Sequence, residues 1–292
     1  MKNQNIIIFS SIDWTTHWQI HHQLTTSLIE SDNRVLFIEN IGVRAPSIKD
    51  LHRVKSRITS RFNSTHGFKN EEVKLTINSP IFIPFPYNKF ATYLNSLIIS
   101  RSIRNWSSNA RFDNFIVISF LPTPTIQKII SIISPMLSIY YCADDMGRTL
   151  KNPSKLEFFE KKMFQSSDYV FTTSNKKYKQ AKTFNINVAY IPAGVSIKNF
   201  TYSENISRLP DTIQSINTPI IGYIGAISDV FDKKLIITIA NFFSEATILL
   251  VGPIYTDISE LQACSNIILT KEVAYNEISK YVQNFDVALI PY

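Results

Sequence analysis

A chain of 292 residues is long enough for two domains, and its hydrophobic content of 45% is that of a globular protein, not of a disordered or fibrous one. The formal net charge of +7 favours an anionic partner such as a nucleotide, a nucleic acid or a lipid headgroup surface, without choosing among them. The sequence has no zinc-finger spacing and no RNA-binding aromatic motif, so we expect no nucleic-acid partner.

The cysteines and the N-terminus indicate a cytoplasmic protein. Cys142 and Cys264 each lie beside an apolar segment, which predicts reduced and at least partly buried thiols. The first residues lack the long apolar core and the small-residue cleavage site of a signal peptide. The most apolar region, Phe115 to Cys142, is interrupted by prolines and a lysine, and therefore reads as strand, helix and strand rather than as a membrane span.

Apolar runs alternate with helical periods along the first 200 residues, which we expect to form a Rossmann-like domain. Short apolar runs predict strands at Ile6–Ser10, Arg34–Asn40, Phe115–Phe120, Leu137–Cys142, Tyr169–Thr173 and Val188–Pro192. Helical spacing of apolar residues predicts helices at 18–30, 47–62, 90–103, 154–165 and 175–184. Val73–Asn78 and the proline-flanked stretch 81–85 are both expected to be extended.

The same strand–helix rhythm starts again at Pro219. Residues 201–218 lie in a tract rich in Ser, Asn and Thr and are predicted to be a connector. Strands are expected at 219–225, 246–252, 266–270 and 286–291, and helices at 232–243, 256–264 and 275–283. A doubly wound domain usually needs more than four strands, so residues 219–292 are expected to be an incomplete domain. We predict an α/β protein with two Rossmann-like domains that face a cleft.

Two carboxylates, Asp144 and Asp145, directly follow a predicted buried strand. Side chains at the carboxyl ends of parallel strands face the ligand crevice in this architecture. There the pair could hydrogen-bond sugar hydroxyls, hold a metal, or act as a base if burial raised a pKa. The alternative is a helix N-cap or a solvated loop, where aspartate is also favoured.

The loop after the first strand offers a second group of polar and aromatic side chains. Asp13 and His17 could provide acid–base chemistry, and Trp14 a flat apolar face for a sugar ring. Alternatively, Trp14 belongs to the core and His17 is merely exposed. The histidines at 17, 21 and 22 do not form a zinc pattern, because no Cys or Glu at ligand spacing accompanies them, and no metal site is predicted.

Glycines lie in or at the end of the first two predicted strands of the second domain. Gly222, Tyr223 and Gly225 precede Lys233 and Lys234, and glycine turns let backbone N–H groups approach a phosphate. The pattern matches neither GxGxxG nor GxxxxGK[ST], so a tight strand-to-helix turn is the alternative. The next two strands end in residues that could meet a nucleobase, namely Gly252, Lys271, Glu272 and Val273.

The segment 47–62 combines an apolar helical face with Arg53, Lys55, Arg57 and Arg61 on other positions of the same turns. Such a helix can lie on an anionic membrane surface. The alternative is an ordinary helix that packs on the sheet and leaves its basic face in solvent. Only the first of these two interpretations predicts peripheral contact with the inner face of the cell membrane.

Eight segments in order resemble retaining family 4 glycosyltransferases of the GT-B fold, the glycosyl transferases group 1. They are RVLFIEN with Arg44 after it, YYCADD, 167–174, IPAGVSIKNF, PIIGYIGAI, ILLVGP, NIILTKEVAYNEISKYV and FDVALIPY. Such enzymes move a sugar from a nucleotide-diphosphate sugar, bound by the C-terminal domain, to an acceptor on the N-terminal domain. The resemblance implies no cofactor and no metal, because positive side chains can stabilise the leaving diphosphate.

The resemblance also implies a role for each candidate residue. Gly222, Tyr223 and Gly225 would border the donor diphosphate, with Lys233 or Lys234 as cationic partners and the Lys271–Val273 segment at the base. Asp144 and Asp145 would reach the donor sugar. The acceptor side would be formed by Asp13, Trp14, His17 and Arg44.

Two departures from the family pattern bear on activity. The turn GYIGAISD lacks the arginine that many relatives carry there, and the chain stops before the family's glutamate-containing donor motif. We therefore weigh two functions. The first is a glycosyltransferase that acts on a saccharide or lipid-linked acceptor in cell-surface polysaccharide biosynthesis. The alternative is a non-catalytic GT-B protein that binds sugar nucleotides or supports a partner subunit.

Overall fold

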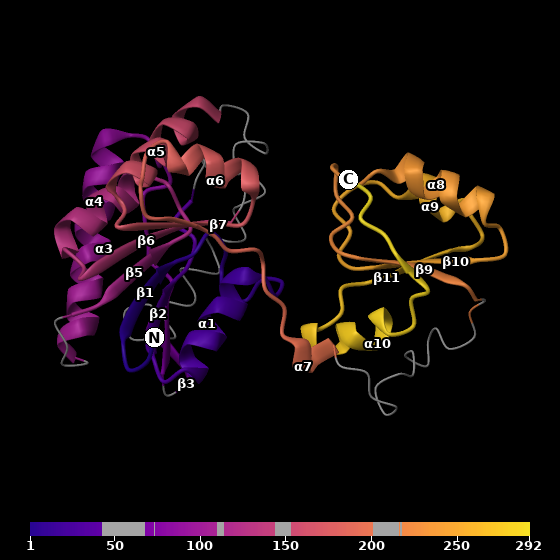
Figure 1. Ribbon diagram of the computed structural model, residues 1–292, viewed down its shortest axis with the longest axis horizontal. Helices are drawn as coiled ribbons and strands as arrows, with labels where there is room; N and C mark the ends of the chain where they lie inside the picture. The colour runs from indigo at the N-terminus through magenta and orange to yellow at the C-terminus, as the bar shows by residue number, and fades with distance from the viewer. Residues whose placement is uncertain (43–67, 73, 110–113, 144–152, 201–215, 217) are drawn as a thin grey trace. The chain divides into compact units, whose positions relative to one another are not determined.

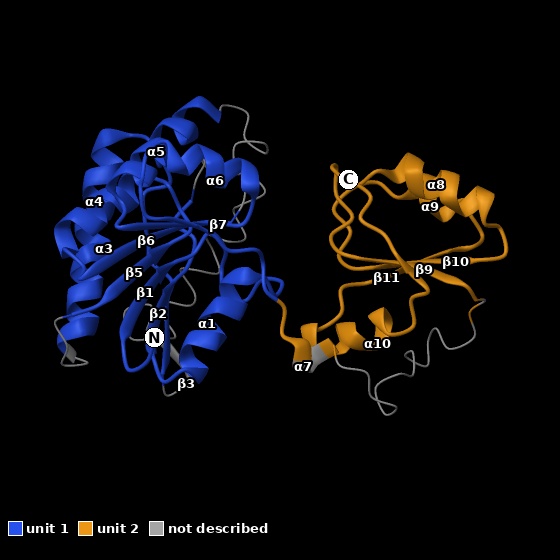
Figure 2. Ribbon diagram, in the orientation of Figure 1, with its two compact units in different colours: residues 1–194 blue, residues 195–292 orange. Residues whose placement is uncertain are grey.

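The computed structural model describes residues 1–42, 68–72, 74–109, 114–143, 153–200, 216 and 218–292 (Figure 1). The chain divides into two compact units, Met1–Gly194 and Val195–Tyr292, shown in different colours in Figure 2. Each unit has its own sheet and its own hydrophobic core.

An eight-stranded sheet forms the centre of the first unit, in the order β3-β4-β2-β1-β5-β6-β7-β8. All neighbouring strands are parallel except β3 and β4. The chain order reverses between β1 and β5, which is where open parallel sheets bind ligands. The strands are β1 Asn5–Phe9, β2 Arg34–Ile38, β3 Phe68–Glu72, β4 Leu75–Asn78, β5 Ile116–Ser119, β6 Leu137–Cys142, β7 Tyr169–Thr172 and β8 Val188–Tyr190.

Helices cover both faces of this sheet, because its strands are apolar on both sides. Ile7 and Val117 face a core with the helices α3, α4, α5 and α6, whereas Ile8 and Phe37 face a core with α1. Figure 1 shows α1 on the opposite side of the sheet from the other four. The helices are α1 Ile20–Glu30, α3 Lys89–Asn109, α4 Pro124–Ile133, α5 Pro153–Ser166 and α6 Asn175–Lys182.

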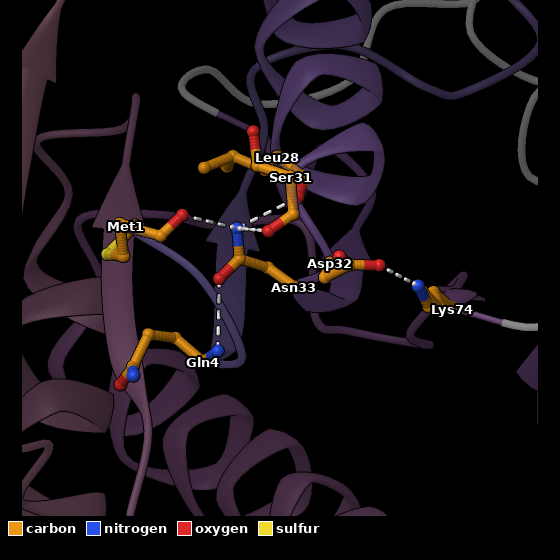
Figure 3. Close-up of polar contacts among 7 residues, drawn as sticks. All are labelled: Met1, Gln4, Leu28, Ser31, Asp32, Asn33 and Lys74. Atoms are coloured by element: carbon orange, nitrogen blue, oxygen red, sulfur yellow. Dashed lines mark hydrogen bonds and ion pairs between the residues drawn. The ribbon is translucent and has the colours of Figure 1, made fainter.

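Asn33 joins three segments at the amino end of β2 (Figure 3). Its buried side-chain oxygen accepts a hydrogen bond from the Gln4 backbone N–H at 3.0 Å, and its amide nitrogen donates to the carbonyls of Leu28 at 2.8 Å and Met1 at 3.2 Å. These bonds pair the side chain with backbone groups of three separate segments. The side chain therefore fixes the end of α1 against the first strand.

The second unit contains a four-stranded parallel sheet in the order β11-β10-β9-β12. One face packs on α8 through residues such as Ile236 and Leu250, and the other carries Leu249 beside Tyr281 of α10. The strands are β9 Ile220–Ile224, β10 Thr247–Val251, β11 Ile267–Thr270 and β12 Val287–Ala288. The helices are α7 Ile197–Phe200, α8 Lys233–Phe242, α9 Ser259–Gln262, the 3-10 helix η4 Tyr275–Glu277 and α10 Ile278–Val282.

The expected α/β class with two parallel-sheet units is confirmed, and every predicted strand is present. The expected helix 256–264 is shorter, because the Asp257 side chain accepts a hydrogen bond from the Ser259 N–H and forms a turn ahead of α9. Residues 81–85 are not part of a strand, and β3 had not been predicted. Both cysteines are free, with Cys142 buried and Cys264 partly buried. The amphipathic segment 47–62 lies outside the described residues.

Candidate functional site

Three turns that contain glycine or charged residues lie at the carboxyl edge of the second sheet. Because all four strands are parallel, their carboxyl ends lie at one edge. Gly225 directly follows β9, Gly252 follows β10, and Lys271 follows β11. The Gly225 N–H donates to the Val251 carbonyl at 3.0 Å, which holds the first two turns together. The predicted glycine turns therefore do share an edge with Lys271.

Gly252 allows these two turns to approach each other more closely than other residues would. Its φ angle is +147°, and a Cβ atom there would lie 2.1 Å from the Gly225 carbonyl oxygen. A side chain at this position would therefore be both strained and obstructed. The result is two closely packed backbone turns without side chains at the sheet edge, with Gly225 half-buried and Gly252 buried. Backbone of this kind can come close to a phosphate or a base.

Gly222 and Tyr223 lie within β9 rather than at its end. A Cβ atom on Gly222 would lie 2.3 Å from the ring of Phe285, so this glycine makes room for an aromatic side chain of the core. The Tyr223 ring is buried, and its hydroxyl donates to the Ala226 carbonyl at 3.0 Å and lies 2.7 Å from the Tyr292 hydroxyl. Burial raises the pKa of Tyr223. Of the three predicted residues, only Gly225 stands at the edge itself.

The amino end of α8 combines a carboxylate with the two predicted lysines. The Asp232 side chain caps the helix by accepting the Leu235 N–H at 2.9 Å. Lys233 donates to the Asp257 carbonyl at 2.9 Å, which ties the helix to the loop after β10. Lys234 is exposed. Lys233 therefore has a structural contact, and Lys234 is the better placed cation for an anionic ligand.

The segment after β11 has two exposed charged residues followed by one partly buried apolar residue. Lys271 and Glu272 are exposed, whereas Val273 is partly buried against the cluster that contains Tyr281 and Phe285. Val273 thus anchors this turn to the sheet. The two charged side chains remain at the edge.

In the first unit, the loop after β1 is held by the core rather than standing free. The Trp14 ring lies 5.0 Å from Phe37 and 4.9 Å from His22, between ring centroids, and its backbone N–H donates to Glu39 at 2.8 Å. The partly buried position of Trp14 fits the alternative in which it belongs to the core. Asp13 and His17 flank it and are partly exposed.

Glu39 is a buried carboxylate at this edge that the sequence reasoning did not select. One oxygen accepts from the Trp14 N–H, and the other from the Ser79 hydroxyl in the loop after β4. It therefore links the segments that follow β1, β2 and β4. In the sequence, Glu39 can be recognised as the carboxylate that directly follows the apolar residues of RVLFIEN.

Two adjacent histidines on α1, His21 and His22, lie under the same edge. Burial lowers the pKa of both, with His21 at about 3. His22 accepts from the Gln19 N–H at 3.1 Å and lies 2.9 Å from the Trp14 carbonyl, which suits a neutral ring. His21 lies 2.9 Å from the Ser11 hydroxyl. Both rings thus support the first loop in their neutral form.

Asp144, Asp145 and Arg44 lie outside the described residues. The last described residue before the aspartates is Ala143, whose carbonyl accepts from the Thr173 hydroxyl at 2.6 Å. Below it, a buried ion pair joins α5 and α6, with 2.7 Å between Lys177 Nζ and Glu160 Oε2. The end of β6 is therefore firmly packed.

The described part of the chain contains neither a metal-binding cluster nor a membrane-spanning helix. No group of three or more His, Cys, Asp or Glu residues there is arranged to hold a metal ion. No helix in these ranges is long and apolar enough to cross a membrane.

Neither the family models nor the curated proteins contain a match to this chain, whereas solved structures do. Anabaena HepE in complex with UDP-glucose is similar with a TM-score of 0.62 and 12% identity, over 98% of this chain and 73% of that one. A glycosyltransferase from Rickettsia africae is similar with a TM-score of 0.59 and 13% identity, over 99% and 73%. Starch synthase IV from Arabidopsis thaliana, bound to ADP and acarbose, gives 0.55 and 7%, over 100% and 77%. The fold of this chain is that of GT-B glycosyltransferases.

Proposed function

We propose that this chain is a glycosyltransferase that moves a sugar from a nucleotide-diphosphate sugar to a saccharide or lipid-linked acceptor, in cell-surface polysaccharide biosynthesis. The observation that carries the proposal is the carboxyl edge of the second sheet. There, the closely packed turns at Gly225 and Gly252 lie beside the start of the Lys271 turn, on a fold similar to structures that hold UDP-glucose or ADP.

The donor nucleotide would lie along this edge. Backbone N–H groups beside the two glycines would face the diphosphate, with Lys234 and Lys271 as cationic partners. The base would lie against the Lys271–Val273 turn, where Val273 provides an anchored apolar contact. Lys233 would act indirectly, by holding the Asp257 loop to α8.

The acceptor side is assigned to the edge of the first sheet. Asp13, His17 and Arg44 would contact the acceptor, and Trp14, held by Phe37, would shape the loop. Asp144 and Asp145 are proposed as the catalytic carboxylates that reach the donor sugar, with retention at the anomeric carbon. Alanine at either position in a transferase assay should then abolish turnover while leaving nucleotide binding unchanged.

The experiment that tests the donor site is calorimetric titration of the 292-residue chain with UDP, GDP and UDP-glucose. We expect saturable binding of one nucleotide. Lys271→Ala and Lys234→Ala should each weaken it about tenfold, as expected for the loss of one charged contact to a phosphate. Lys179→Ala is the matched control, because this exposed lysine lies on α6 of the other unit.

Each result has a definite reading. A folded chain that binds none of the nucleotides contradicts the proposal. A chain that binds a nucleotide but transfers no sugar, in assays with saccharide and lipid-linked acceptors, would support the alternative of a sugar-nucleotide binder or partner subunit. The cap by Asp232 favours that alternative, since it places a carboxylate where many anion sites have only backbone N–H groups.

A further inference from the structure

The outward face of α3 carries large apolar side chains in solvent. Phe90 is 70% exposed, Tyr93 53%, Leu97 42% and Ile98 51%. Spacings of three and four residues place the first three in one stripe along the helix. The opposite face already packs in the core through residues such as Ile99 and Ile103. Among the described residues of this unit, the second apolar face is therefore not part of the hydrophobic core. Exposed patches of this kind mark interaction sites.

The loop before α3 extends this surface with Phe85, which is 54% exposed. Buried Asn95 fixes the loop by accepting the Ile83 N–H at 2.7 Å and donating to the Ile83 carbonyl at 2.9 Å. Asn88 caps the helix by accepting the Ala91 N–H at 3.0 Å. The aromatic side chain is thus exposed on an ordered loop. We call Phe85, Phe90, Tyr93, Leu97 and Ile98 the α3 apolar patch.

The patch lies toward the carboxyl edge of the first sheet. Tyr87, just before α3, stacks on Phe159 of α5 at 5.8 Å between centroids. The Phe159 carbonyl in turn accepts from Gln127 at 2.8 Å, in the first turns of α4, which begins shortly after β5 ends. Figure 1 shows α3, α4 and α5 in one layer on the sheet. The start of α3 is therefore at the edge that holds the first loop.

The charged residues of α3 itself are all cationic. The sequence of α3 contains Lys89, Arg101 and Arg104 but no Asp or Glu in its 21 residues. Lys89 and Arg101 are exposed, and the whole chain has a net charge of +7. Aromatic and leucine side chains with lysine and arginine beside them are typical of helices that lie in the interface of an anionic bilayer. Two copies of the patch would instead bring like charges together.

We propose that the α3 apolar patch docks on an anionic lipid surface, with its apolar side chains among the headgroups and with Lys89 and Arg101 against the lipid phosphates. This contact does not depend on the proposed function. Its purpose does, because holding the carboxyl edge of the first sheet near the bilayer would bring a lipid-linked acceptor to that edge.

Cosedimentation with vesicles tests the proposal. The full chain is mixed, without nucleotide, with vesicles of phosphatidylcholine alone or with added phosphatidylglycerol. We expect binding to the anionic vesicles that weakens with salt. The substitution pair F90S/L97S should reduce the affinity at least about tenfold, because it removes two inserted apolar side chains. The pair K89A/R101A should abolish the preference for anionic lipid.

Controls make each outcome decisive. Phe242→Ser changes an aromatic side chain of α8 that is 79% exposed, and it should bind vesicles like the unchanged chain. Circular dichroism verifies that each variant is folded. The proposal is overturned if the folded chain ignores anionic vesicles, or if F90S/L97S binds them equally well. Self-association that F90S/L97S abolishes, without vesicle binding, would instead assign the patch to a second copy. Nucleotide titration of the same sample tests the donor site separately.

Discussion

The imidazole of His21 is buried against Phe120, with 4.0 Å between the ring centroids. Its Nδ1 atom has no hydrogen-bond partner within the described structure, while Nε2 lies 2.9 Å from the Ser11 hydroxyl. Burial, and secondarily the neighbouring His22, lower the His21 pKa from the ordinary 6.5 to about 3. The folded chain therefore accepts only a neutral ring here, which makes its stability depend on pH.

We expect His21 to destabilise the fold as the pH falls below 6.5. Between 6.5 and about 3 the unfolded chain binds one more proton than the folded chain at this site. The free energy of unfolding therefore falls as pH falls, by up to about 1.4 kcal/mol per pH unit from this group, and is unaffected by it above 6.5. His22, whose pKa is also lowered, adds a contribution of the same sign.

Urea denaturation of the unchanged chain and of His21→Asn, at a series of pH values, isolates the effect of one histidine. The variant should be less stable at neutral pH, because it loses contact with Phe120. The difference in free energy of unfolding between the two chains should become smaller as the pH falls, because only the unchanged chain has to bury His21 uncharged. If the free energy of unfolding changed with pH by the same amount in both chains, the His21 pKa would not be lowered by folding.

At the scale of elements, the ion pair of Glu160 and Lys177 joins α5 to α6 beneath the end of β6. Its two side chains are only 6% and 9% exposed. Glu160 also accepts from the Tyr140 hydroxyl at 3.2 Å and from the Cys142 thiol at 3.5 Å. Burial raises the pKa of both donors, which keeps them protonated as donors. One carboxylate thus organises the packing of three elements.

Removing one partner of this pair should be strongly destabilising. Lys177→Met leaves the Glu160 charge buried without its cation, which costs about 3 to 5 kcal/mol. The double substitution E160Q/K177M should recover most of the loss, because glutamine keeps an acceptor for the Tyr140 hydroxyl without a charge. Denaturant midpoints measure both effects.

The matched control is Lys74→Met, which breaks an exposed ion pair with Asp32 at 2.6 Å (Figure 3). Exposed pairs contribute little, so no measurable change is expected there. A K177M chain as stable as K74M would mean that the buried pair contributes nothing beyond packing.

The sequence predicted the elements well where a single physical signal decides them. Buried parallel strands are continuous apolar runs, so IIIFS and LSIYYC were readable without a structure. The edge strand β3, with the sequence FKNEE, has no such run and was missed. Glu39 was missed as well, because its partner Ser79 lies 40 residues away in the chain. The sequence predicts Gly222 either beside a phosphate or in a tight strand-to-helix turn, and only the position of Phe285 reveals its packing role.

At the scale of the whole molecule, the two units have separate sheets and separate cores. The second unit, Val195–Tyr292, is the smaller, and small units bury a smaller fraction of their surface on folding. We therefore expect two calorimetric unfolding transitions, with the second unit melting first. Gly222→Ala should lower the melting temperature of the second unit only, because the added Cβ atom would overlap the Phe285 ring.

A nucleotide that binds at Gly225 and Gly252 should raise the melting temperature of the second unit. The melting temperature of the first unit should not change. At a concentration of about 100 times Kd, binding to the folded state alone adds about 2.7 kcal/mol to the free energy of unfolding of that unit. Scanning calorimetry of the unchanged chain and of Gly222→Ala, with and without UDP, assigns each transition to a unit. The transition that Gly222→Ala leaves unchanged belongs to the first unit. If UDP raised the melting temperature of that transition alone, the nucleotide would bind the first unit, and the proposed donor site in the second unit would be wrong.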